Sequence, residues 1–184
     1  MQVSDEKLRQ ILRERERLKN PPQSTDKATG VGVARFIVSC TDVSLVLGLA
    51  KEVLITVNDY STQNWLSLDE WSNVLPSRFV DCCSSELTSE ERKERTQIWQ
   101  ELSYEEKLKE ASNDNEWTLS SWLSWLEPNE REWFWWNAVL FDEPLNNSHF
   151  IIEVTALDSP FMSGALKWLF KACGALDIIS EDDL

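Results

Sequence analysis

Histidine is nearly absent from this sequence, with His149 the single example among 184 residues. The four cysteines, Cys40, Cys82, Cys83 and Cys173, include no pair with CxxC spacing. Structural zinc sites are built from closely spaced Cys and His ligands, so this composition argues against one. Because disulfides belong mainly to oxidising compartments, we expect four reduced thiols in a cytoplasmic protein.

Long apolar runs are also missing. No stretch approaches the roughly 18 consecutive apolar residues of a membrane-spanning helix. Residues 1–20 are highly charged and contain no apolar segment of the kind that signal peptides carry. We therefore expect a soluble protein that does not associate with membranes.

Motifs of common catalytic and cofactor sites are absent as well. The sequence holds no GxGxxG, no P-loop and no GxSxG, so no cofactor is expected. His149 and Glu153 are four residues apart on a predicted strand and would share a face, where they could act as acid and base. No nucleophile is marked nearby, which favours a histidine without a catalytic role. The sequence leans towards a protein that is not an enzyme.

The charge is acidic and unevenly distributed along the chain, with a net value of −14. Residues 1–35 hold eight Lys and Arg against five Asp and Glu, whereas residues 36–184 hold ten against twenty-seven. An acidic body repels nucleic-acid backbones and anionic lipid surfaces, so neither is an expected partner. A protein partner, if it is recognised by charge, is expected to be basic.

Tryptophan is the residue that the sequence has in excess, with ten among 184 residues. The indole is large and carries an N–H that needs an acceptor when it is buried. Ten indoles indicate either an aromatic-rich core or an aromatic surface used for contact. The chain is long enough for one domain whose core needs no disulfide or metal.

The first thirty residues are predicted to form a helical arm and a linker. Ser4 is a suitable N-cap for a helix over residues 4–19, which Pro21 and Pro22 bring to an end. We expect the apolar stripe of this helix to pack against the acidic body, residues 31–184, or against a second subunit. The stripe consists of Leu8, Ile11, Leu12 and Leu18.

The body is predicted to be a single α+β domain. The segment 42–51 fits a helix capped by Asp42, but its alternating apolar residues also fit a strand. A further helix is expected from Ser159-Pro160 to Cys173. Alternating or β-branched patterns predict strands over 33–40, 52–58, 78–83, 132–141, 149–157 and 176–179.

The order of these segments predicts two β-α-β units that form a mixed or antiparallel sheet. Residues 132–141 and 149–157 would pair as a hairpin around a turn over 142–148. Two such units fit the ferredoxin-like plan, in which a split βαβ pair builds one sheet.

A large helical insert, at about residues 64–127, is predicted between the β units. Its helices would begin at three capping boxes, in which a Ser or Thr is followed three residues later by Glu. These are Ser67 with Glu70, Thr88 with Glu91, and Ser103 with Glu106. After a turn at 113–115, a last helix is expected over residues 118–126.

Three aspartates are weak candidates for a metal site. Asp42, Asp59 and Asp158 each follow a predicted strand, and carboxylates gathered at one sheet edge could bind a cation. Helix-capping and turn roles explain the same residues and are the favoured interpretation, so no metal is expected.

The strand over 132–141 is unusually aromatic. If Phe141 pairs with Phe150, then Trp133, Trp135, Asn137 and Val139 face the core, and the outer face carries Trp136 beside Glu153. A central strand covered on both faces is the favoured interpretation. The functional alternative is an aromatic recognition surface or subunit interface that includes Trp136 and Glu153.

The leading functional hypothesis is a non-enzymatic binding or regulatory module that acts through a protein partner, with the insert and the outer face of 132–141 as its working surface. Trp122 and Trp125 lie on one short helix that cannot easily bury both, so at least one should be partly exposed, near Glu116, Glu127 and Glu130. Such an aromatic suits a partner that offers Arg or Lys. Two alternatives are a carboxylate-based, metal-dependent enzyme and an acidic inhibitor or immunity-type protein.

Overall fold

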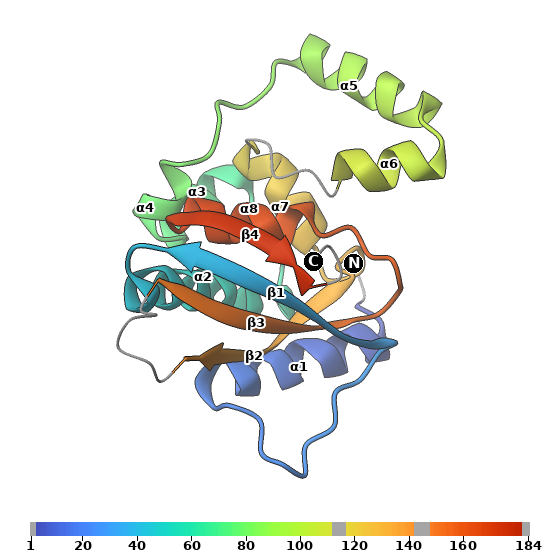
Figure 1. Ribbon diagram of the computed structural model, residues 1–184. Coiled ribbons are helices and arrows are strands. Elements are labelled where there is room, and N and C mark those ends of the chain that lie inside the picture. The colour runs from blue at the N-terminus through green and yellow to red at the C-terminus, as the bar shows by residue number, and fades with distance from the viewer. Residues whose placement is uncertain (1–2, 112–116, 142–147, 182–184) are drawn as a thin grey trace.

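A four-stranded antiparallel sheet organises the protein, in the order β2-β3-β1-β4 (Figure 1). The computed structural model describes residues 3–111, 117–141 and 148–181. The strands are β1 (Gly32–Cys40), β2 (Trp133–Leu140), β3 (His149–Ala156) and β4 (Ala175–Ser180). The predicted α+β class is confirmed. The predicted turn at 113–115 lies outside the described residues, as do residues 142–147 of the turn predicted over 142–148.

The connections follow the predicted ferredoxin-like plan. β3 lies between β1 and β2 and is antiparallel to both, while β4 pairs with the other side of β1. Each half of the sheet is therefore a βαβ unit whose two strands are separated by one strand from the other half. The predicted position of the helical insert between the two units is wrong: the second strand of the first unit is β2 rather than 52–58, so the connection from β1 to β2 contains the entire insert.

The predicted strand over 52–58 is wrong, because these residues belong to α2 (Val43–Ser61). The Asp42 carboxylate caps this helix by accepting the N–H of Leu45 at 3.0 Å. The β-branched residues suggested a strand, but the buried positions follow helical spacing and form one stripe against the sheet. They include Val46, Ala50, Val53 and Val57.

The predicted strand over 78–83 is also wrong. This segment contains the short helix α4 (Ser77–Val80), which begins directly after Pro76. The N–H of Val80 donates to Pro76 O at 3.1 Å, and that of Asp81 donates to Ser77 O at 2.8 Å. Phe79 is fully buried, so a single helical turn directs the one large apolar side chain into the core.

The other helices of the insert begin where the capping boxes predicted. They are α3 (Leu68–Val74), α5 (Ser89–Glu101) and α6 (Tyr104–Ala111), while α7 (Leu119–Leu126) begins after its N-cap Thr118, within the range predicted for the last helix, 118–126. Both reciprocal bonds of the capping box are present at Ser67 and at Thr88. Ser103 and Glu106 make the same pair of contacts before α6.

The helix after β3 is shorter than predicted: α8 spans Gly164–Ala172 rather than starting at Ser159-Pro160. Upstream of it, the N–H of Met162 donates to the Glu132 carboxylate at 3.3 Å, an interaction that ties this segment to the start of β2 instead of to a helix.

Within the described residues, no helix is long and apolar enough to cross a membrane.

The core lies between one face of the sheet and the helices α2 and α8, which pass behind the strands in Figure 1. Phe170 of α8 joins the helix layer to the strands, with its ring 5.9 Å from that of Phe150 and 6.3 Å from that of Trp135. We refer to the sheet face that packs on α2 and α8 as the inner face and to the opposite face as the outer face.

A bulge in β2 changes the predicted register. Leu140, rather than Phe141, pairs with Phe150, and the pairing shifts between Trp135 and Asn137. One extra residue in a strand exchanges the faces beyond it. Trp133 and Trp135 are therefore in the core as predicted, but the placement of Asn137 and Val139 there is wrong, because both lie on the outer face with Glu153 and Ile151.

The arm helix α1 (Asp5–Lys19) packs on the body of its own chain, along β2 and α2 (Figure 1). Ser4 caps it, as predicted. Ile11 and Leu18 are buried, whereas Leu12 is 52% exposed. The face that contacts the body is therefore rotated away from the predicted stripe and includes the polar residue Glu14.

Candidate functional site

The tryptophans of the insert divide into a buried set and a half-buried set. Trp71 and Trp122 are fully buried, and Trp122 Nε1 donates to the carbonyl oxygen of Ala165 on α8 at 3.0 Å. The half-buried set consists of Trp65, Trp99, Trp117 and Trp125. At least one of Trp122 and Trp125 was expected to be partly exposed; Trp122 is fully buried and Trp125 is half-buried.

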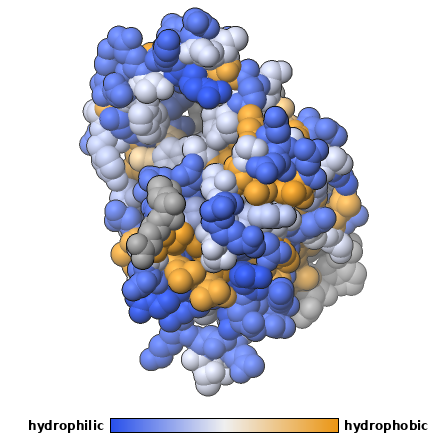
Figure 2. All heavy atoms as spheres, turned by 180° about the vertical axis from the view of Figure 1, so that it is seen from behind, coloured by the Kyte–Doolittle hydropathy of each residue, from blue (hydrophilic) through white to orange (hydrophobic). Residues whose placement is uncertain are grey.

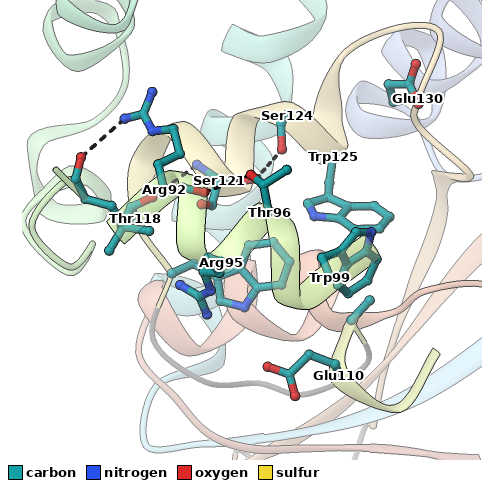
Figure 3. Close-up of a pocket in the computed structure, with 13 residues that line it drawn as sticks. Arg92, Arg95, Thr96, Trp99, Glu110, Thr118, Ser121, Ser124, Trp125 and Glu130 are labelled. Carbon is teal, nitrogen blue, oxygen red and sulfur yellow. Dashed lines mark hydrogen bonds between the residues drawn. The ribbon is translucent and has the colours of Figure 1, made fainter. Parts of the chain in front are cut away.

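Three of the half-buried tryptophans line one cleft of about 470 Å³ between α5, α6 and α7 (Figure 3). This volume lies within the range of roughly 300–1,000 Å³ that is usual for ligand pockets. We call it the tryptophan cleft. Its lining is formed by Leu87, Arg92, Arg95, Thr96, Trp99, Glu110, Ala111, Trp117, Thr118, Ser121, Ser124, Trp125 and Glu130.

Trp125 of α7 is the centre of the aromatic wall. Its ring meets Trp99 of α5 edge to face, with 6.3 Å between centroids, and meets Trp117 in the same way at 6.4 Å. Figure 3 shows Trp99 and Trp125 side by side. Because all three rings are only half-buried, their faces and edges are available to a bound group.

Hydrogen bonds to the segment at residues 84–86 hold the start of α7 in place beside the cleft. Glu86 accepts the backbone N–H of Ser120 at 2.9 Å and also the Ser120 hydroxyl. The N–H of Ser84 donates to Trp117 O at 2.9 Å, and Ser84 forms a parallel bridge with Thr118. The chain before α5 is thus tied to the helix on the opposite side of the cleft.

The opposite wall, α5, is held much more loosely. None of its residues is buried, and Ile98 on its outer side is 53% exposed. Figure 2 shows the lobe that contains α5 at the top of the molecule, with a mostly hydrophilic surface. A helix with so little buried area has little tertiary stabilisation, and such elements open at low free-energy cost.

Charges of both signs surround the cleft. Arg92 and Arg95 lie on the side away from Trp99 and Trp125 in Figure 3, whereas Glu130 lies beyond Trp125. Arg92 is held 3.8 Å from the Glu86 carboxylate. Of the predicted carboxylate rim, Glu130 lines the cleft and Glu116 lies outside the described residues, while Glu110 is an acidic lining residue that was not predicted.

The other two predicted binding residues, Trp136 and Glu153, are not among the lining residues of this cleft and belong to the sheet. Trp136 is the bulged residue of β2 and is half-buried beneath the Arg17 guanidinium, which lies 5.5 Å from the ring centroid. Glu153 lies on the outer face, where it accepts hydrogen bonds from Arg35 and from Asn137.

The structure does not bring the three candidate metal-binding aspartates together. Asp42 and Asp59 belong to opposite ends of α2, which at 1.5 Å per residue separates them by roughly 25 Å. Asp59 instead pairs with Arg15 at 2.7 Å, and Asp158 accepts the N–H of Ser159. In the described part of the chain, no three His, Cys, Asp or Glu residues are grouped to hold a metal ion.

Sequence reasoning missed the arginines and hydroxyls of the cleft. Arg92 and Arg95 lie on a helix that looks like an ordinary solvated element, and Ser121 and Ser124 look like neutral surface positions. One local signal was available: Arg92, Thr96 and Trp99 recur at helical spacing and so share one side of α5.

Comparisons of the chain with family models, with curated proteins and with solved structures found no match in any of the three. The case for a function therefore depends on the geometry of this chain alone.

Proposed function

We propose that the protein is a cytoplasmic, non-enzymatic binding module that acts through a protein partner, and that the tryptophan cleft is its working surface. The observation that carries the proposal is the set of three half-buried indoles, Trp99, Trp117 and Trp125, around one cavity. Tryptophan at the centre of a concave surface is the residue type most enriched among binding hot spots.

The partner that fits this cleft best offers a Lys or Arg side chain. A cation over an indole face gains a favourable interaction of about 0.5–2 kcal/mol, depending on its desolvation. Glu110 and Glu130 lie at the cleft and can supply the counter-charge. An acidic residue next to that Lys or Arg in the partner would meet Arg95, which makes no ion pair with the residues that the structure describes.

The geometry also supports a binding role over a catalytic one. Three of the hydroxyls that line the cleft are used locally: Thr96 Oγ1 donates to Arg92 O, Thr118 Oγ1 accepts the N–H of Ser121, and Ser124 Oγ donates to Ser121 O. None of the described lining residues is a Cys or His. The cleft thus offers contact area and charge rather than an activated nucleophile.

The proposal is tested by affinity capture with wild-type protein and two variants of α5 and α7. Trp125→Ala removes the central indole, whereas Ile98→Ala is a matched truncation of an exposed residue on the outer side of α5. A partner of this cleft is retained by wild type and by Ile98→Ala and is lost by Trp125→Ala, while all three proteins have the same circular dichroism. A partner retained equally by Trp125→Ala would contradict the proposal.

A further inference from the structure

The outer face of the sheet carries a second surface, separate from the tryptophan cleft. Inner-face residues such as Val38 and Ile152 are fully buried. On the outer face, Ile179 is 37% exposed, and Ile37, Val139 and Ile151 are half-buried. Figure 1 views this face, with the strands in front of α2 and α8. No described helix other than α1, at the β2 edge, packs along this side of the sheet.

One row of this face is apolar across the whole sheet. The register pairs Ile37 with Ile151, Ile37 with Ile179, and Ile151 with Val139. The four side chains form a continuous stripe of β-branched residues perpendicular to the strands, one from each strand. Solvated sheet faces are usually polar, so a complete apolar row indicates a surface that packs against something.

The next row is charged, and its signs alternate. Arg35 on β1 pairs in register with Glu153 on β3, and its guanidinium lies 2.7 Å from the Glu153 carboxylate. Glu181, after β4, lies 3.8 Å from the other side of Arg35. Asn137 on β2 completes the row and donates to Glu153 at 3.1 Å.

We propose that this outer face binds the same face of a second copy of the chain, through a two-fold axis that runs parallel to the strands between β1 and β3. That axis places β3 of one copy over β1 of the other. Ile37 then lies over Ile151 of the second copy, and Arg35 lies over Glu153 of the second copy. Two faces with isologous symmetry must be self-complementary, and this row meets that condition because no like charges are superimposed.

The size of the face bears on the strength of this contact. Four strands and about six residues per strand cover roughly 15 Å by 20 Å. This is smaller than the area that stable complexes use, about 800 Å² per partner, so the dimer should be weak. The net charge of −14 opposes association, and about 0.15 M salt screens that repulsion.

Sedimentation of the full chain between about 10 μM and 1 mM tests the proposal. Wild type should change from monomer to dimer, and Ile37→Asp should remain monomeric. If Ile37→Asp does not fold, Ile179→Asp at the exposed edge of the stripe takes its place and should raise the dissociation constant about tenfold or more. A wild-type chain that stays monomeric throughout, or a folded stripe variant that dimerises as wild type does, overturns the proposal.

A charge-swap mixture tests the pairing itself. Arg35→Glu and Glu153→Arg should each be monomeric, because each places like charges across the interface. Mixed in equal amounts they should form a heterodimer, since opposite charges then face each other between copies although like charges remain within each chain. A mixture that does not associate shows that the Arg35–Glu153 pair acts only within the chain and overturns the two-fold arrangement.

Trp125→Ala should dimerise as wild type does, so this proposal and the proposed function can fail separately.

Discussion

Arg131 Nη2 lies 2.6 Å from Glu14 Oε1, and both side chains are almost completely buried between α1 and the edge of the sheet. The same carboxylate oxygen accepts the backbone N–H of Trp135 at 2.5 Å. A carboxylate from the arm helix therefore covers an N–H of the edge strand β2 that has no strand partner on that side. Burial raises the pKa of Glu14 and lowers the pKa of Arg131, the directions expected when two charges lose their water.

Removing one member of this pair should destabilise the protein strongly. Arg131→Met or Glu14→Gln leaves a buried charge without a partner, which typically costs about 3–5 kcal/mol. The double variant Glu14→Gln with Arg131→Met leaves neither charge and should lose much less than the sum of the single changes. Urea denaturation of the four proteins measures this coupling, and additive losses would contradict it.

Trp135 should be among the residues on which the core depends most. Its ring is buried and stacks on Phe170 with an interplanar angle of 26°. Trp135→Ala should lower the free energy of unfolding by about 3–5 kcal/mol. Leu140→Ala, at a position of the same strand that is 56% exposed, is the control and should cost about 0.5 kcal/mol or less. Equal losses at the two positions would show that Trp135 is not part of the core.

The start of α5 should depend on pH. Glu91 accepts the N–H and hydroxyl of Thr88, and these hydrogen bonds hold the pKa of Glu91 below its usual value of 4.5. An acid with a lowered pKa stabilises the folded form above its unfolded pKa, and this contribution is lost as the pH falls through the lower, folded value. Amide NMR signals of the first turn should therefore weaken below about pH 4.5. In Glu91→Gln they should change little between pH 6 and pH 3, and a parallel loss in both proteins would argue against the capping box as the cause.

The four thiols should differ in reactivity in the folded protein. Cys82 is exposed, whereas burial raises the pKa of Cys83 to about 11 and also raises the pKa of Cys40 and Cys173. Because the thiolate is the reactive form, a maleimide at pH 7.5 should add once, at Cys82, before it adds elsewhere. Intact-mass spectrometry of wild type and Cys82→Ser gives the order of labelling. Rapid modification of the Cys82→Ser variant would show that another thiol is accessible.

Local patterns predicted the secondary structure of those segments whose conformation is determined by their own residues rather than by tertiary packing. The capping boxes at Ser67 and Thr88 start helices as expected, and the hairpin of β2 and β3 follows from two alternating segments. Residues 52–58 were misassigned because β-branched residues fit a strand locally, whereas burial against the sheet favours the helix α2. Local propensity does not include the free energy that the helix gains by packing against the sheet.

The candidate site was only partly predictable for a related reason. The short helix α7 indicated that Trp122 and Trp125 could not both be fully buried; Trp122 is fully buried and Trp125 only half-buried. The arginines of α5 could not be placed, because α5 buries none of its residues and its pattern therefore indicates no preferred neighbour. The bulge at Trp136 is a similar case, since one inserted residue changes the faces of β2 without any proline or glycine to mark it.

The central claim is that the tryptophan cleft binds a basic side chain, and the ten indole N–H signals of the protein test it most directly. Titration of 15N-labelled protein with acetyl-Gly-Arg-Gly-amide, followed by NMR, should shift the indole signals of Trp99, Trp117 and Trp125. The signals of the buried Trp71 and Trp122 should not move, and acetyl-Gly-Glu-Gly-amide should produce smaller shifts at the three cleft residues. Shifts spread over all ten indoles, or none at the cleft at millimolar peptide, would contradict the account.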